Sequence, residues 1–392
     1  MQKKAIVLAV GALMAAPGVM AQAIELYGKA YPELVSISGS GASRTGTFVS
    51  TISGTPNGTN AIVRRNEMES GNARFGIRGS EKIGAVTAIF QMETAFGLDS
   101  TGTAFANRDS FVGVKGGFGT LRLGRMDTVF KSYGDTVSFL GVSSGNFVST
   151  SAIMRFTGFG TSNASSFHLR RANAIDYATP ELGGLAFGIQ YSPGEAKTAT
   201  RNPEVMSLGV KFEKGPMYFA LAHEIHDDMF GGSNNAPGTR SNVADQSVNS
   251  KDKATQATAR VKFGVHTVAL DVNKKKYNET ARVAGRFQTY ENTSVGISNE
   301  SRWSPTVRTA FHYIKAGQGS CTLLGVACQT NGLAGTQVSV GAQYLFSRRT
   351  NLFSMYSLLY NGSGARYNNA NLQSPAVGED LRQFAVGISH TF

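Results

Sequence analysis

The stretch Arg108–Phe147, RDSFVGVKGGFGTLRLGRMDTVFKSYGDTVSFLGVSSGNF, joins a tight hairpin to a long irregular segment. Residues alternate in character along Arg108–Lys115 and again along Thr120–Arg125, and the turn Gly116–Gly119 connects the two runs. This pattern predicts two antiparallel strands. The next segment, Met126–Phe167, has no clean helical or strand period. At roughly 40 residues it is far longer than the usual connection of about 4–6, and such loops are usually functional.

Short and long joins between alternating runs follow one another along the whole chain. The short joins, marked by Gly or Pro, lie at Glu81–Ala85, Gly116–Gly119, Pro180–Gly184, Lys214–Pro216, Gly264–His266, Ser304–Pro305 and Ser347–Thr350. The long polar joins lie at Ser38–Ser70, Gly97–Asn107, Met126–Phe167, Ser192–Pro203, Asp227–Asp252, Asn278–Glu291, Cys321–Leu333 and Asn361–Asp380. Seven short and eight long joins predict sixteen strands, with turns on one side and loops on the other, as in an outer-membrane β-barrel.

The faces of the predicted strands agree with a lipid-facing exterior. One face of Thr87–Glu93 carries Ala88, Phe90 and Met92, and the other carries Thr87, Gln91 and Glu93. Along Gln337–Phe346, one face carries Val338, Val340, Ala342, Tyr344 and Phe346. Transmembrane barrels place apolar residues outside, whereas a soluble sandwich hides them. Periodicity alone does not choose between the two, but the loop asymmetry, the even strand count and the N-terminus favour the barrel.

The N-terminal segment, residues 1–23, has the composition of a secretory signal peptide. Lys3 and Lys4 precede the apolar run Ala5–Met20, and small residues follow at Ala21 and Ala23. The run is short for a spanning helix and lacks a stop-transfer flank, so we expect cleavage, after Ala21 or Ala23, in preference to an uncleaved anchor. Residues 24–392 then form the barrel outside the cytoplasm.

Composition narrows the class of protein further. Without Lys3 and Lys4 the formal net charge falls from +12 to +10. A basic chain can bind nucleic acid, but an exported chain without an aromatic-basic recognition module favours no such partner. No second run of about 18 apolar residues follows the signal segment, which excludes spanning helices.

The two cysteines, Cys321 and Cys328, lie in one Gly-containing segment, CTLLGVAC. An even cysteine count in an exported chain predicts a disulfide. The alternative, metal binding, is weaker because two thiols do not complete a zinc site.

The last strand, Leu381–Phe392, alternates and ends on an aromatic residue, Phe392, which resembles the assembly signal of bacterial outer-membrane barrels. Six stretches resemble Gram-negative general diffusion porins of the type found in Burkholderia, Bordetella and Neisseria: Ala73–Gly84, Ala88–Phe96, Phe105–Val114, Phe118–Asp127, Asn173–Ser192 and Val338–Thr350. The resemblance covers Ile24–Phe392. It implies a homotrimer of sixteen-stranded antiparallel transmembrane β-barrels, each with its third external loop folded into the lumen.

Basic residues on the predicted inner wall are candidates for a pore constriction. If Phe75 and Ile77 face lipid, then Arg74 and Arg78 face the lumen. Similar alternation turns Arg122 and Arg170 inward. Arg108 lies near a bend where alternation can fail, and there the resemblance implies that the matching arginine faces inward. Arg74, Arg108 and Arg170 fall at motifs where the resemblance implies a basic wall; the full set is Arg74, Arg78, Arg108, Arg122 and Arg170. In the alternative interpretation, some of them pair with Glu93 or Asp176 and only stabilise the wall.

The predicted inner loop departs from the family pattern, in which this loop is often rich in acidic residues. Met126–Phe167 contains only Asp127 and Asp135 as acids, against Lys131 and Arg155. The resemblance therefore leaves the selectivity open. Charges inside a narrow pore act strongly on ions, and the basic wall favours a mild preference for anions.

Three further motifs match patterns of known functional sites, but each has a simpler interpretation. Gly141–Gly145 matches G-x-S-x-G, but it lies in a loop without the strand and helix that a nucleophilic Ser143 would need. Glu224 and His226 share a strand face and could bind a metal, although a polar strand end is the simpler interpretation. The run Lys274–Lys276 is expected to be solvated, with binding of lipopolysaccharide phosphate as a hypothesis.

Together these patterns predict a porin: a non-catalytic channel, without cofactor or metal, for passive diffusion of small hydrophilic solutes and ions across the outer membrane. The expected partners are two further copies of the chain, outer-membrane lipid, lipopolysaccharide and the outer-membrane barrel assembly machinery. A substrate-selective channel for small anions or organic acids is the first alternative. An outer-membrane hydrolase using Ser143 is the second.

Overall fold

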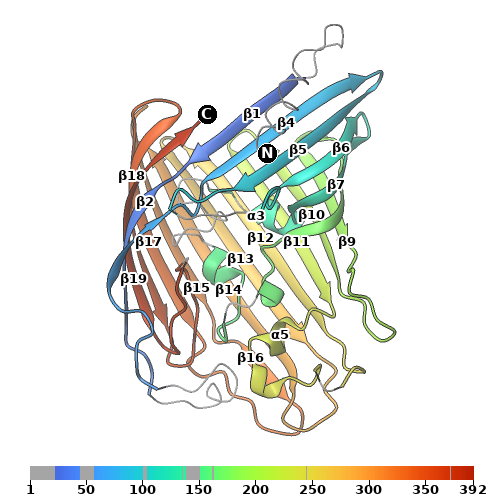
Figure 1. Cartoon of the computed structure of the whole chain (residues 1–392), viewed down its shortest axis with the longest axis vertical. Helices are drawn as coiled ribbons and strands as arrows, with labels where there is room; N and C mark the ends of the chain where they lie inside the picture. The colour runs from blue at the N-terminus through green and yellow to red at the C-terminus, as the bar shows by residue number, and fades with distance from the viewer. Residues whose placement is uncertain are drawn as a thin grey trace, which may run out of the picture.

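The computed structural model describes residues 23–44, 57–99, 104–134, 136–137, 151–160, 163–243, 245–370 and 372–392. The expected signal peptide therefore lies outside the described residues up to position 22, as do Asp135 and the Gly141–Gly145 motif. The described chain forms one antiparallel sheet that closes on itself, because β19 pairs with both β1 and β2 (Figure 1). No helix among these residues is long and apolar enough to cross a membrane.

Nineteen strand segments make up the sheet: β1 Ala23–Ala30, β2 Glu33–Ser40, β3 Arg65–Glu69, β4 Arg74–Ile83, β5 Val86–Ala95, β6 Ser110–Gly116, β7 Gly119–Asp127, β8 Arg170–Ala178, β9 Leu185–Ser192, β10 Glu204–Lys214, β11 Met217–Asp227, β12 Lys251–Phe263, β13 His266–Asn278, β14 Phe287–Arg302, β15 Val307–Ala316, β16 Ser320–Leu323, β17 Gly335–Leu345, β18 Thr350–Asn361 and β19 Asp380–Thr391. Short helices α3 Val129–Gly134, α4 Ser151–Met154 and α5 Gly231–Asn234, and 3-10 turns η1 Asn163–Ser165 and η2 Pro237–Thr239, lie in the joins.

The nineteen segments combine into sixteen strands that span the wall, as the sequence predicts. β1 and β2 are halves of one strand that breaks at Tyr31–Pro32, because β1 pairs with β4 while β2 pairs with β3. β3 and β4 are likewise consecutive, and β16 continues β15 along the edge of β14. The fold is thus a closed antiparallel barrel of sixteen strands. Each of the seven predicted short joins contains a turn between two strands at one end of the barrel, although β4 extends into the first of them as far as Ile83.

The tight turn between β6 and β7 illustrates why these joins need glycine. Gly116 pairs with Gly119 across the turn, and Gly119 has a φ of 111°. A side chain at this left-handed position would be strained, and a Cβ there would lie 2.2 Å from the Ala178 carbonyl oxygen. Glycine therefore lets β7 reverse direction while keeping contact with β8.

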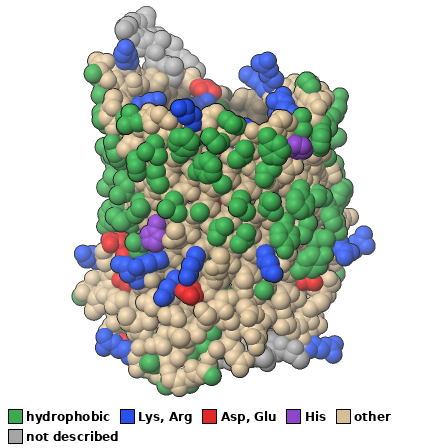
Figure 2. Space-filling model, turned by 180° about the vertical axis from the view of Figure 1, so that it is seen from behind, with side chains coloured by type: hydrophobic (Ala, Val, Ile, Leu, Met, Phe, Trp, Pro, Cys, Tyr) green, Lys and Arg blue, Asp and Glu red, His purple; other side chains and the backbone are tan. Residues whose placement is uncertain are grey.

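The two faces of the wall have opposite polarity, as predicted. Along β17, Val340 and Tyr344 are exposed while Gln337 and Ser339 are fully buried. Figure 2 shows the outcome on one side of the molecule, where hydrophobic side chains form a belt around the barrel. This arrangement is that of a barrel in lipid, with apolar residues outside and polar residues toward the lumen.

The C-terminal residue closes the seam between the first and last strands. The backbone N–H of Phe392 donates to the Gly28 carbonyl and the N–H of Gly28 donates to the Phe392 carbonyl, both at 3.1 Å. A Cβ at Gly28 would lie 2.3 Å from the Phe392 ring, so a larger residue there would require the ring to move. The role of Phe392 as an assembly signal stays a prediction.

The expected disulfide between Cys321 and Cys328 is present, with 5.7 Å between the two Cα atoms. It closes a tight loop at the end of β16, where the partly buried sulfurs pack against a cluster that includes Phe287 and Leu323. The bridge therefore holds the long join before β17 against the wall.

We predict that neither thiol of the folded, oxidised protein reacts with maleimide until reductant is added. Changing both cysteines to serine should lower the free energy of unfolding by about 2.5 kcal/mol, the chain-entropy value for so short a loop. The conductance should hardly change, because the bridge constrains an external join. Thiol labelling and urea unfolding measure these effects, and labelling of both thiols without reductant would contradict the bridge.

Candidate functional site

Glu93 on β5 joins two of the predicted wall arginines. Its carboxylate forms an ion pair with Arg108, and its second oxygen lies 3.9 Å from the Nε of Arg74. Tyr27 on β1 also donates to this carboxylate at 3.1 Å. Glu93 itself is buried. Its charge would be unfavourable there without the two guanidinium groups that neighbouring segments of the wall supply.

A second ion-pair group connects the wall to the start of the long loop. Arg170 on β8 pairs with Asp109, directly before β6, and, at 2.8 Å, with Asp127 at the end of β7. Lys131 in α3 pairs with the same Asp127 carboxylate at 2.9 Å, one helical turn further along the chain. Strand ends far apart in sequence thus hold the first turn of the loop by charge.

Arg78 and Arg122 make separate pairs away from these groups. Arg122 lies 2.7 Å from Asp176, and Arg78 makes a bidentate pair with Glu25 on β1. The Arg78–Glu25 pair is about half exposed, near the short-turn end of the strands. The structure therefore brings Arg74, Arg108 and Arg170 together and leaves the other two predicted arginines in local wall contacts.

Asp109 is a member of the cluster that the sequence reasoning missed. It accepts from the side chain of Arg170 and from the backbone N–H of Asp127, the latter at 3.1 Å. Its position directly after Arg108, at the start of an alternating strand, is the only local signal that could have found it. Its partner lies 61 residues away in the sequence, a distance over which strand periodicity carries no information.

The first helix of the loop contacts side chains on the buried face of distant strands. The backbone N–H of Phe130 donates to Ser207 Oγ on β10 at 2.9 Å, and Tyr218 on β11 donates to the Tyr133 carbonyl at 2.7 Å. Ser207 is fully buried, whereas its strand neighbours Met206 and Leu208 are exposed. The helix therefore packs on the polar, non-lipid face of the wall.

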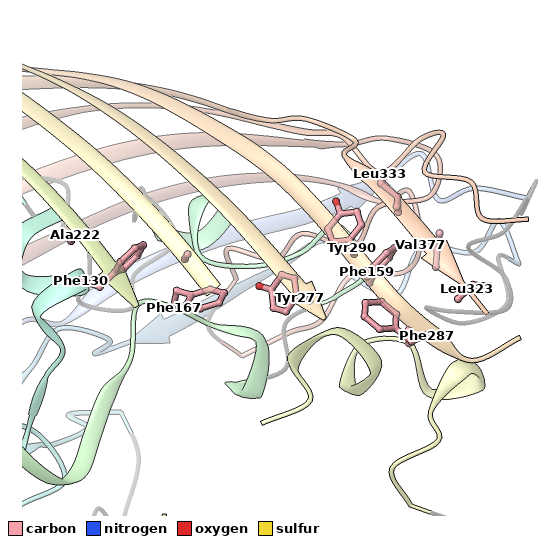
Figure 3. Packing of buried hydrophobic residues seen from close by; sticks show 12 residues of the cluster. Phe130, Phe159, Phe167, Ala222, Tyr277, Phe287, Tyr290, Leu323, Leu333 and Val377 are labelled. Carbon is pink, nitrogen blue, oxygen red and sulfur yellow. The ribbon is translucent and has the colours of Figure 1, made fainter. Parts of the chain in front are cut away.

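Aromatic residues continue this contact along the loop. Phe130 and Phe167 belong to a cluster that reaches Tyr277 on β13 and Phe287 and Tyr290 on β14 (Figure 3). The phenol of Tyr277 donates to the Ser165 carbonyl. The returning half of the loop is thus attached to β13 both by packing and by a buried hydrogen bond.

Lys275 is buried, which corrects the expectation of a solvated lysine run. Its ammonium donates to the Met154 carbonyl at 2.8 Å and to Ser294 Oγ at 2.9 Å, and the side chain is fully buried. Lys274 and Lys276 remain exposed. Because neighbours on a strand point to opposite faces, the run places one lysine against α4 and two on the outside.

Two buried histidines near this wall each lie within hydrogen-bond distance of a neighbouring side chain. Burial lowers the pKa of His168, just before β8, to about 3, so the ring is neutral near pH 7. The ring lies 3.0 Å from Gln256 on β12. His226 is hydrogen-bonded to Glu224 at 2.9 Å and stacks on Phe167 with 4.5 Å between ring centroids. No group of three metal-ligating side chains occurs within the described ranges.

The barrel, with its apolar belt and its charged, polar inner wall, defines a transmembrane channel of the outer-membrane kind. A family model described as Gram-negative porin matches residues 7–364. The chain therefore belongs to the Gram-negative porin family. It is a diffusion channel of the outer membrane.

Relatives in sequence agree with this assignment. The chain is 26% identical over 303 residues to the major outer membrane protein P.IB of Neisseria lactamica, covering 76% of this chain and 80% of the relative. It is also 26% identical over 314 residues to the protein of the same name from Neisseria gonorrhoeae, with 76% and 81% covered.

Solved structures show the same fold. The anion-selective porin from Comamonas acidovorans superposes with a TM-score of 0.69 at 18% identity, covering 95% of this chain and 100% of that one. The trimer form of OmpT from Vibrio cholerae gives 0.63 at 13% identity, with 95% and 100% covered. Salmonella typhi OmpF in complex with daunomycin gives 0.57 at 17% identity, with 94% and 97% covered.

The hydrogen bond from Tyr277 to the loop provides a direct test of loop anchoring. We predict that Tyr277→Phe lowers the free energy of unfolding by about 1–3 kcal/mol, because the Ser165 carbonyl loses its buried donor. The matched change Tyr360→Phe, at an exposed tyrosine on the lipid side, should change it by less than about 0.5 kcal/mol. Urea unfolding in detergent measures both, and equal effects would contradict the anchoring role.

Proposed function

We propose that the channel passes small hydrophilic solutes by passive diffusion with a mild preference for anions. The cluster at β4–β8 carries this proposal. It combines four basic side chains, Arg74, Arg108, Arg170 and Lys131, with three acidic ones, Glu93, Asp109 and Asp127. The excess of one positive charge is small because the pairs compensate each other, and this agrees with a mild preference in place of a strong one.

The loop Met126–Phe167 is proposed to fold into the lumen and to narrow it. Support comes from its contacts with inward-facing side chains on β10, β12, β13 and β14, which lie two to six strands from β8 around the wall. A loop placed there holds Asp127 and Lys131 beside Arg170 at the edge of the lumen. The narrowed lumen then excludes large solutes. Small ions pass within a short distance of these charges, where screening by water and salt is reduced.

We assign no catalytic role to the chain. Its proposed partners are two further copies of itself, the lipid and lipopolysaccharide around it, and the assembly machinery that would engage the strand ending in Phe392. A substrate-selective channel for small anions or organic acids is the competing function, since the same arginines could bind carboxylates or phosphates. A conductance that one such solute blocks saturably would favour this alternative.

The selectivity is tested by charge reversal at Arg108. We predict that Arg108→Glu shifts the reversal potential in asymmetric KCl toward cations, with Arg108→Gln intermediate, because the cluster then has a net negative charge. Lys197→Glu, in an exposed part of the join before β10, changes the total charge equally and should shift the potential little. Equal shifts for Arg108→Glu and Lys197→Glu, or a strongly cation-selective wild type, would overturn the assignment.

The trimer is tested by electrophoresis without boiling. We expect a heat-dissociable oligomer with sheet-dominated circular dichroism, as the trimer form of the structurally similar Vibrio cholerae OmpT suggests. Migration as a monomer before heating would contradict the proposed trimer, because the protein in mild detergent would then have no stable contact between copies.

A further inference from the structure

Two glycines stand side by side on the inner face of β9 and β10. Gly188 on β9 pairs directly with Gly209 on β10 in the strand register. Both face inward, because their strand neighbours Phe187 and Leu208 are exposed on the lipid side and successive residues of a strand alternate between its faces. The pair leaves a flat area on the inner wall, since neither residue has a side chain. We call Gly188 and Gly209 the glycine seat.

The ring of Tyr133 in α3 lies on the glycine seat. A Cβ added at Gly188 would be 2.8 Å from the Tyr133 hydroxyl oxygen, and a Cβ added at Gly209 would be 2.9 Å from Cδ2 of the ring. Nonbonded carbon atoms prefer a separation of about 3.5–4.0 Å, so the ring lies closer to these strands than a side chain at either position would permit. The ammonium of Lys211, also on β10, is 5.8 Å from the ring centroid and adds a cation–π contact.

The two ends of α3 also lie close to the wall. Val129, one helical turn before Tyr133 and on the same face, has its Cγ1 atom 3.3 Å from a Cβ added at Gly188. At the other end, a Cβ added at Gly134 would be 1.8 Å from Nε2 of Gln256 on β12. A side chain at Gly188 would therefore meet two residues of α3, so a larger residue there would displace the helix as well as the ring.

Displacement of α3 from the glycine seat can only be toward the lumen. The helix packs against the inner face of β9–β12, and the sheet lies behind it (Figure 1). Moving the ring of Tyr133 from 2.9 Å to the preferred separation from a new Cβ requires a shift of about 1 Å. The absence of two side chains from the wall thus lets α3 take up less of the lumen.

We propose that the glycine seat determines the size of solute that the channel admits. This inference rests on the proposed position of the loop Met126–Phe167 inside the lumen, and it names the wall residues that set how far α3 projects there. The seat acts on solute size, whereas the proposed anion preference arises from the charged cluster around Arg108. Gly188 and Gly209 are therefore positioning residues, because they act on solutes through α3.

The test measures the single-channel conductance in KCl and the largest polyethylene glycol that enters the pore. Gly188→Val and Gly209→Val should each lower both quantities, because valine is well accepted in strands and moves α3 into the lumen. The control, Gly117→Val, lies in the turn between β6 and β7, where an added Cβ meets no atom within 4 Å, and should leave both unchanged. Heat-dependent migration on electrophoresis identifies the folded barrels that are compared. Unchanged values in the two seat variants, or an equal decrease in the control, would overturn the proposal.

A double-mutant comparison distinguishes displacement of the helix from direct narrowing by the new side chain. The atom nearest to a Cβ added at Gly209 belongs to Tyr133, so Gly209→Val should lower the conductance of the wild type but not that of the Tyr133→Ala variant. An equal decrease in both backgrounds would show that valine itself blocks the pore, and the seat would then have no positioning role.

A cross-link separates this proposal from the position of the loop. Val129→Cys with Gly188→Cys, in a chain whose Cys321 and Cys328 are changed to serine, should form a disulfide, because the 3.3 Å between Cγ1 of Val129 and a Cβ at Gly188 is within its reach. Bridge formation together with unchanged conductance of the valine variants would overturn the glycine seat and keep the inward loop. Absence of the bridge would contradict the inward loop, and the proposal with it.

Discussion

Closure of the backbone hydrogen-bond ladder is the constraint on which the rest of this structure depends. In the hydrocarbon layer a backbone N–H or C=O has no water to bind, so a sheet can span a membrane only without free edges. Here the last strand, β19, pairs with β1 and β2 and returns the ladder to its start. The tight contact of Phe392 with Gly28 lies at this seam. Once the ladder is closed, every second side chain must face lipid and the others must face inward.

The side chains that face inward are largely polar groups that form hydrogen bonds and ion pairs with one another. Buried carboxylates such as Glu93 and Asp176 meet arginines, and serine, asparagine and glutamine side chains occupy the wall between them. Such groups are stable only when they are paired or hydrated. The long loop adds partners of its own, because Lys275 and Tyr277 donate to its carbonyl groups. The same contacts that satisfy the wall therefore also fix the loop.

Ion pairing on the inner wall limits how strongly its arginines attract anions. An isolated ladder of arginines would strongly attract anions, but Arg108 and Arg170 each share the field with carboxylates that they contact. The field at the wall is then directed from basic toward acidic groups, and only a small net charge remains. On the outer surface, Lys276 on β13 stands between Lys253 on β12 and Glu291 on β14 in the strand register.

Local patterns in the sequence determined the strands, their number, the sides on which turns and loops lie, and the pairing of Cys321 with Cys328. Period-two alternation and turn residues act over a few neighbours, so they can be read without knowing the fold. The strand register decided the rest: that Arg74 and Arg108 share Glu93, that Asp109 joins Arg170, and that Lys275 is buried while its neighbours are exposed. These contacts join strands separated by tens of residues and a loop without periodicity, and only closure of the barrel sets their distances.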